Sequence, residues 1–94
     1  MKFFDDIDIK VLKENFDDDT INKVDTENLV KILQYLNDNG VYYYKDIVLE
    51  YLDLFLNPYE MFTEKFDELK SRLGSDFVER IANDKSLIEI MYED

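Results

Sequence analysis

Residues that break helices are scarce in this chain, and their scarcity constrains the fold more than any other feature of the sequence. Among 94 residues there are only two glycines, Gly40 and Gly74, and one proline, Pro58. A β-sandwich or barrel needs many tight turns, which usually contain Gly or Pro, whereas helices joined by short connections need few. The sequence therefore predicts an all-α fold, a compact single-domain bundle of about five to six helices over residues 1–94.

The supply of large apolar side chains is sufficient for one hydrophobic core. Hydrophobic residues make up 46% of the chain and include seven Phe and seven Tyr, which argues against disorder although 36% of the residues are charged. A chain of this size is expected to bury roughly two thirds of its unfolded surface. One independent acidic domain is the expected organisation.

The clearest helix is predicted between Asp25 and Gly40. Asp25 or Thr26 can act as the N-cap, and Gly40 is suited to the left-handed position after the last turn. Apolar residues recur between them at helical spacing. Residues 41–56 are apolar on nearly every face, which predicts a second, central helix. The apolar residues of the first of these helices are Leu29, Val30, Ile32, Leu33 and Leu36.

A third helix is predicted over residues 59–73. Asn57 can cap it, Pro58 suits its first turn, and Glu60 stands where a capping box closes. Apolar residues follow at alternating spacings of three and four as far as Gly74, which predicts an amphipathic helix ended by that glycine.

The two ends of the chain are predicted to contain shorter helices. Ser75 or Asp76 can cap a fourth helix, and Ser86 with Glu89 forms a further capping box before a last apolar segment, so we expect two short helices or one bent helix here. Near the amino terminus we expect a short helix at about 8–15, an acidic turn at 17–19, and a turn of helix through Ile21 and Val24. The first 24 residues are the harder part, because Ile7, Ile9 and Val11 also alternate as in a strand.

Two residue types that dominate enzyme active sites are missing. The chain contains no Cys and no His, so it lacks the commonest zinc ligands and cannot form a Ser–His or Cys–His nucleophile pair. Phosphate-binding glycine loops and dinucleotide motifs are also absent. The acidic segment 17–19 lacks the ligand spacing of an EF-hand, and we expect Asp17 or Asp19 to cap the next helix. The sequence predicts a protein that is not an enzyme and has neither cofactor nor metal.

The chain is strongly acidic, with a formal net charge of −12 that is spread along its whole length. Binding to nucleic acid or to an anionic membrane would require basic patches, so neither is expected, and a basic protein is the expected partner. The first residues lack the apolar run of a signal peptide, and no segment is apolar enough to span a bilayer. The natural interpretation is a cytoplasmic protein.

These features favour an acidic binding protein that inhibits a basic nucleic-acid-binding protein or nuclease by occupying its nucleic-acid groove. Carboxylates on a rigid body resemble the charge array of a nucleic-acid backbone, as in the DNA mimics that phages and mobile elements use against host defences. Usage rich in Asn, Asp, Lys, Ile and Tyr is common in low-GC bacteria and their phages. The residues predicted to contact the partner are Asp5, Asp6, Asp8, Asp17, Asp18, Asp19, Tyr42 and Tyr43.

Tyr42 and Tyr43 belong to three consecutive tyrosines, which point about 100° apart on a helix and so cannot all face one core. Tyr44 fits the core stripe, so Tyr42 or Tyr43 is expected to be exposed, and exposed Tyr is enriched at binding hot spots. An alternative is that these rings pack at a loop corner with their hydroxyls in water.

Two other functions fit the sequence. An immunity protein or antitoxin that neutralises a basic toxin would use the same electrostatics. A helical adaptor or self-associating regulatory protein would use the amphipathic helix at 59–73 or the apolar segment 86–92. For the adaptor, a homo-oligomer is expected if the last apolar residues do not pack on their own domain. These residues are Leu87, Ile88, Ile90 and Met91.

Overall fold

The computed structural model describes residues 6–92, and these residues form α-helices and 3₁₀-helices with no strand among them. The predicted all-α bundle is confirmed. The chain order, with η for a 3₁₀-helix, is α1 (Asp6–Asn15), α2 (Asp18–Asn22), α3 (Thr26–Asp38), α4 (Tyr44–Glu50), η1 (Leu52–Leu56), α5 (Tyr59–Leu73), α6 (Phe77–Asn83) and η2 (Lys85–Tyr92).

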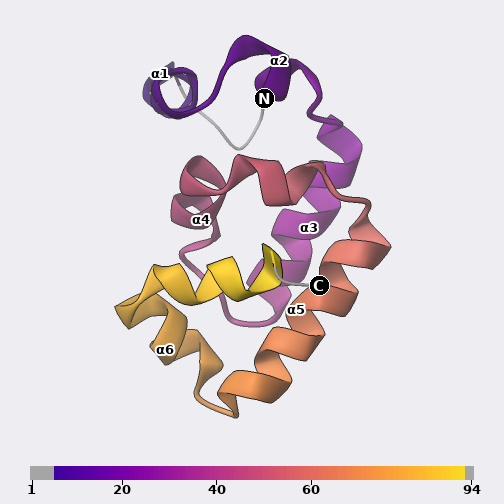
Figure 1. The fold of residues 1–94 in the computed structure, drawn as a ribbon, viewed down its shortest axis with the longest axis vertical. Coiled ribbons are helices and arrows are strands. Elements are labelled where there is room, and N and C mark those ends of the chain that lie inside the picture. The colour runs from indigo at the N-terminus through magenta and orange to yellow at the C-terminus, as the bar shows by residue number, and fades with distance from the viewer. Residues whose placement is uncertain (1–5, 93–94) are drawn as a thin grey trace.

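Helices α3 and α5 lie side by side and run in the same direction (Figure 1). Their first turns are joined through Asn28 and Tyr59, and their last turns through Asn39 and Lys70. Helix α4, with η1, and the pair α6 and η2 complete the body. Helices α1 and α2 lie at the opposite end of the molecule from α6. Helix α1 packs there against α4.

A single apolar cluster joins these helices. All elements from α3 to η2 contribute fully buried side chains, whereas within residues 6–22 only Leu12 is buried. The N-terminal helices are therefore held by fewer core contacts than the rest. The central side chains of the cluster, each at most 2% exposed, include Leu29, Ile32, Leu33, Leu36, Ile47, Leu52, Phe55, Phe62, Phe66, Leu69, Ile81 and Ile88.

Both ends of α3 follow the sequence prediction. The Asp25 side chain is the N-cap and accepts hydrogen bonds from the main-chain N–H groups of Glu27 and Asn28. At the other end, the N–H of Val41 bonds to Leu36 and that of Gly40 to Asn37, which is the Schellman arrangement. Gly40 has φ of 84°, a conformation that glycine adopts with little strain.

The helix predicted over residues 41–56 is not continuous. Helix α4 begins only at Tyr44, and the chain breaks at Tyr51, with φ of −129°, before the 3₁₀-helix η1. Because this segment is apolar on nearly every face, a straight helix would leave part of it in water. The break allows Leu52, Leu54 and Phe55 all to be buried, and in a 3₁₀-helix residues three apart share one face.

Helix α5 spans the predicted range, but its predicted cap is wrong. Neither Asn57 nor Glu60 provides a side-chain cap: the Asn57 amide donates to the main-chain oxygen of Leu54 instead. The cap comes from α3, where the Asn28 side chain accepts a hydrogen bond from the Tyr59 N–H at 2.8 Å and donates to the Asn57 main-chain oxygen at 2.8 Å. A residue distant in sequence thus satisfies both groups. Helix α5 ends as predicted at Gly74, with φ of 92°.

The last apolar segment packs on its own domain. Ile88 and Met91 are buried, and Leu87 and Ile90 are half-buried against the core. The predicted capping box is replaced by Asp84, whose carboxylate accepts hydrogen bonds from the N–H and hydroxyl groups of Ser86. This segment therefore leaves no unpacked apolar tail of the kind that favoured self-association.

The N-terminal prediction of helices rather than a strand is confirmed. Helix α1 covers the expected segment and begins at Asp6. Helix α2 contains Ile21, but it begins at Asp18, within the predicted acidic turn, and ends at Asn22, before Val24. Asp17 is the N-cap of α2, because its carboxylate accepts a hydrogen bond from the Thr20 N–H at 2.8 Å. Among residues 6–92 no helix is long and apolar enough to cross a lipid bilayer.

Candidate protein-binding surface

The acidic residues predicted to contact a partner have different surroundings. Asp5 lies outside the described residues. Asp6, Asp18 and Asp19 are exposed in the first turns of α1 and α2. Carboxylates are favourable at these positions, because the positive end of the helix dipole lies there. These three side chains are available to a partner.

Asp8 has a structural contact. Its carboxylate lies 3.0 Å from the Lys45 ammonium, and its side chain is only 13% exposed. Lys45 belongs to α4, so this ion pair joins α1 to the body of the domain. The assignment of Asp8 to the partner surface is therefore corrected, because its charge is neutralised within the domain.

Asp17 also has a structural contact, although it remains exposed. Hydrogen bonds from Thr20 lower the pKa of the Asp17 carboxyl, since they stabilise its charged form. The exposed side chains of Lys10, Lys13 and Lys23 lie on the same N-terminal elements. This end of the molecule therefore carries both signs of charge, and is less uniformly negative than the run of aspartates suggests.

The three consecutive tyrosines differ sharply in exposure. Tyr42 is 75% exposed, whereas Tyr43 is buried and its hydroxyl donates a hydrogen bond to the main-chain oxygen of Val78. Tyr43 thus takes the core position that the sequence assigned to Tyr44, which is half-buried, and it is not available to a partner. The reason is that α4 begins only at Tyr44, so the preceding turn directs Tyr43 inward.

The exposed Tyr42 ring is supported by its neighbour. The ring lies edge-on to that of Tyr43, with 5.0 Å between the ring centroids. An open hollow beside it is lined by α6 residues, including Val78, Glu79 and Ala82. An exposed, supported ring next to a hollow and a carboxylate has the composition of a protein-binding hot spot.

The basic side chains of the body are engaged by the chain itself. From Lys45 to the end of α6 and η2, every one of them has an intramolecular contact. Lys70 contacts both Asn39 and Asp67 and lies 5.6 Å from the centre of the Phe77 ring. Arg80 donates to the main-chain oxygen of Leu73 at 2.8 Å. The others are Lys45 with Asp8, Lys65 with the main-chain oxygen of Met91, Arg72 with Glu68, and Lys85 with Glu50.

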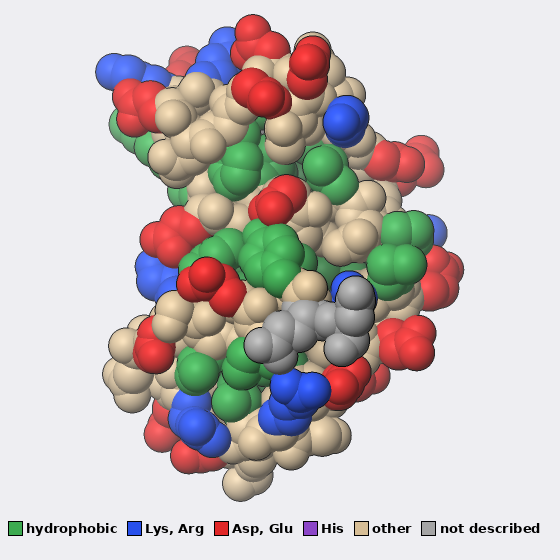
Figure 2. Space-filling model, in the orientation of Figure 1, with side chains coloured by type: hydrophobic (Ala, Val, Ile, Leu, Met, Phe, Trp, Pro, Cys, Tyr) green, Lys and Arg blue, Asp and Glu red, His purple; other side chains and the backbone are tan. Residues whose placement is uncertain are grey.

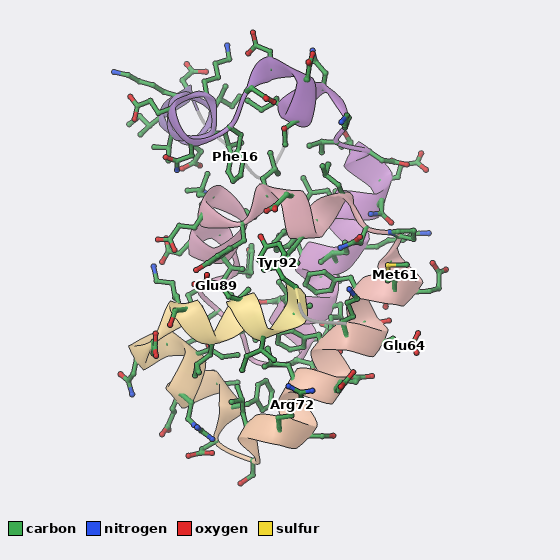
Figure 3. The ribbon with its side chains drawn as sticks, in the orientation of Figure 1. Phe16, Met61, Glu64, Arg72, Glu89 and Tyr92 are labelled. Atoms are coloured by element: carbon green, nitrogen blue, oxygen red, sulfur yellow. The ribbon has the colours of Figure 1, made fainter. Side chains whose placement is uncertain are left out.

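Most acidic side chains are exposed to solvent. Every Asp and Glu within residues 6–92 is exposed except Asp8. Figure 2 shows them spread over the visible face from the α1 and α2 end to the α6 end, rather than gathered in one patch. Glu64 points away from the body at the outer edge of α5 (Figure 3). Four of the six cations from Lys45 onward pair with carboxylates, so each pair balances one charge of either sign and the excess of acidic over basic side chains remains.

Some carboxylates are fixed in place by tyrosine hydroxyls. Tyr92 donates to Asp53 at 2.6 Å, and Tyr51 donates to Glu89 at 3.3 Å. Tyr92 and Glu89 lie along the same face of the molecule on η2 (Figure 3). Burial, followed by the neighbouring carboxylates, raises the pKa of both Tyr51 and Tyr92, so these hydroxyls stay protonated as donors. The acidic surface thus includes carboxylates of fixed geometry.

Within residues 6–92 no group of three or more carboxylates is close enough to hold a metal ion. The chain matches no protein-family model, no curated protein and no solved structure.

Proposed function

We propose that this protein binds a basic nucleic-acid-binding protein or nuclease in the cytoplasm and inhibits it by occupying its nucleic-acid groove. In this proposal the protein is a DNA mimic of the anti-defence type that phages and mobile elements use. It acts by stoichiometric binding and carries out no chemistry of its own.

The observation that carries the proposal is the excess of exposed carboxylates over basic side chains on a folded helical domain. The chain presents roughly one acidic residue per 250 Å² of its surface. Within residues 6–92 every Asp and Glu except Asp8 is exposed, and four of the six cations from Lys45 onward are paired with carboxylates. Such a surface attracts a groove lined with Lys and Arg, as a nucleic-acid backbone does.

The contacts within this surface have two roles. Distributed carboxylates such as Asp18, Asp19 and Glu64 accelerate encounter and orient the partner. Tyr42 supplies apolar contact area at a low entropic cost, because its ring already packs on Tyr43. Electrostatic attraction alone is weakened by salt, so an apolar anchor stabilises the complex at physiological ionic strength.

The test compares two charge variants as baits for a bacterial lysate from which nucleic acids have been removed. The first variant combines Asp46→Asn, Glu64→Gln, Asp76→Asn and Glu79→Gln, four exposed acids with no ion pair among residues 6–92, and changes the net charge from −12 to −8. Bound proteins are eluted with rising salt and identified by mass spectrometry. Proteins held by the wild type should be basic nucleic-acid-binding proteins and should be lost from this variant.

The matched control neutralises four exposed cations, Lys10, Lys13, Lys23 and Lys31, each to Gln, and changes the net charge from −12 to −16. This control carries the same number of surface changes and should retain the same proteins at least as strongly. Equal retention by both variants, or a set of acidic partners that resists high salt, would refute the proposal.

A further inference from the structure

The parallel packing of α3 and α5 leaves an open groove between them on the outer surface, with a volume of about 510 Å³. Its floor and walls include Val30, Tyr35 and Tyr59, and acidic side chains line it at Asp38 and Glu60. Tyr35 lies outside the core stripe of α3, which explains why a large aromatic side chain is available here rather than in the interior.

The two aromatic rings of the groove are held in fixed positions. Their centroids lie 6.2 Å apart at an interplanar angle of 90°. Tyr35 also packs edge-on against Phe66 at 5.8 Å, and its hydroxyl donates to the Asp67 carboxylate at 2.6 Å. The Tyr59 ring packs on that of Tyr35, and the Tyr59 main-chain N–H donates to the Asn28 side chain. A ligand that stacks here therefore orders few side chains on binding, which lowers its entropic cost.

The charges of the groove favour a cation. Carboxylates line the groove from both helices. The Gln34 side-chain amide donates a hydrogen bond of 2.9 Å to the Asp38 carboxylate. Lys31 is the one basic residue among the groove-lining residues, so negative charge prevails. A flat cation that can stack on a tyrosine ring while it donates to a carboxylate fits this combination better than a compact one, and guanidinium is such a group.

We propose that the groove between α3 and α5 receives an arginine side chain of the basic protein partner. The inference rests on the proposed function for the existence of that partner, and it adds the place and the chemistry of one contact. The guanidinium stacks on Tyr35 or Tyr59 and donates hydrogen bonds to Glu60 or Asp38.

The experiment is an NMR titration of the full chain with a blocked peptide, acetyl-Gly-Arg-Gly-Arg-Gly-amide, and with the same peptide carrying Lys in place of Arg. The ring signals of Tyr35 and Tyr59 and the amide signals of the groove should shift. The arginine peptide should bind roughly three- to fivefold more tightly than the lysine peptide, because only guanidinium both stacks and forms paired hydrogen bonds.

A double variant, Asp38→Asn with Glu60→Gln, should lose most of this binding. The matched control, Glu64→Gln with Asp46→Asn, removes the same two charges at exposed positions that do not line the groove. It should bind the arginine peptide as the wild type does. Unchanged amide spectra of both variants away from the substitutions will show that the fold is intact, since these carboxylates are exposed.

Three results would overturn the inference: shifts scattered over the whole acidic surface, equal affinity for the two peptides, or equal losses of binding in the control and in the groove double variant. After any of these results the proposed function still stands, provided that the charge-reduced bait fails to retain the lysate proteins that the wild type binds. Arginine binding in the groove without any basic partner in the lysate would refute the proposed function alone.

Discussion

Replacement of Asn28 by Ala should destabilise the protein far more than replacement of Asn57, the residue that the local sequence identifies as the cap of α5. The Asn28 side chain makes two hydrogen bonds of 2.8 Å, one from the Tyr59 N–H and one to the Asn57 main-chain oxygen. Both groups are partly buried, so water replaces the lost partners only in part. The substitution therefore separates the first turn of α5 from α3.

The magnitude follows from the bonds that are lost. Each hydrogen bond contributes about 1 kcal/mol, and the groups left without partners raise the total to about 2.5 kcal/mol. Ala is the better helix former within α3 by about 0.5 kcal/mol, which offsets part of this loss. The net loss of about 2 kcal/mol corresponds to a fall in Tm of roughly 8–16 °C for a domain of this size.

The assay is urea unfolding followed by circular dichroism, with Asn57→Ala as the matched control. The Asn57 side chain makes one bond, to the Leu54 main-chain oxygen at 3.0 Å. Its removal should lower the free energy of unfolding by about 0.5–1 kcal/mol. If Asn57→Ala proves as destabilising as Asn28→Ala, or more so, the assignment of the cap to α3 is refuted.

Three further predictions concern Tyr43, Asp8 and Gly40. Tyr43→Phe removes the hydrogen bond to the Val78 main-chain oxygen and should lower the free energy of unfolding by about 1 kcal/mol in urea titrations. Burial raises the pKa of Tyr43 to about 12 in the folded protein, above its value in the unfolded chain. The free energy of unfolding of the wild type should therefore be constant just below pH 10 and fall as the pH rises toward 12, and it should fall less steeply in Tyr43→Phe. Asp8→Asn breaks the ion pair with Lys45, and hydrogen exchange should become faster in α1 while that of α3 stays unchanged. Gly40→Ala should lower the free energy of unfolding in urea by about 1 kcal/mol. The cause is backbone strain at φ of 84°, because the added Cβ would meet its nearest neighbour at an ordinary distance of 3.8 Å.

The parts of the fold that depend on local signals were predictable from the sequence. Asp25 and Gly40 delimit α3 through main-chain groups within a few residues, and Gly74 ends α5 in the same way. The cap of α5 and the break at Tyr51 were not predictable, because the first depends on Asn28 in another helix and the second on how the core covers η1.

The candidate surface shows the same division. Net charge and its spread along the chain follow from composition, but the engagement of the cations does not. No spacing in the sequence indicates that Asp8 meets Lys45, or that Arg80 reaches the main chain of Leu73. One signal of the α3 and α5 groove was present: Tyr35 is an aromatic residue off the apolar stripe of its helix.

The central claim, that the protein occupies a nucleic-acid groove, is tested most directly by competition on the captured partner. Fluorescence anisotropy of a labelled DNA duplex bound to that partner is measured as the protein is added, over a series of salt concentrations. We expect stoichiometric release of the duplex and a linear fall of the logarithm of the protein–partner affinity with the logarithm of salt concentration. A ternary complex in which the duplex stays bound while the protein also binds would contradict it.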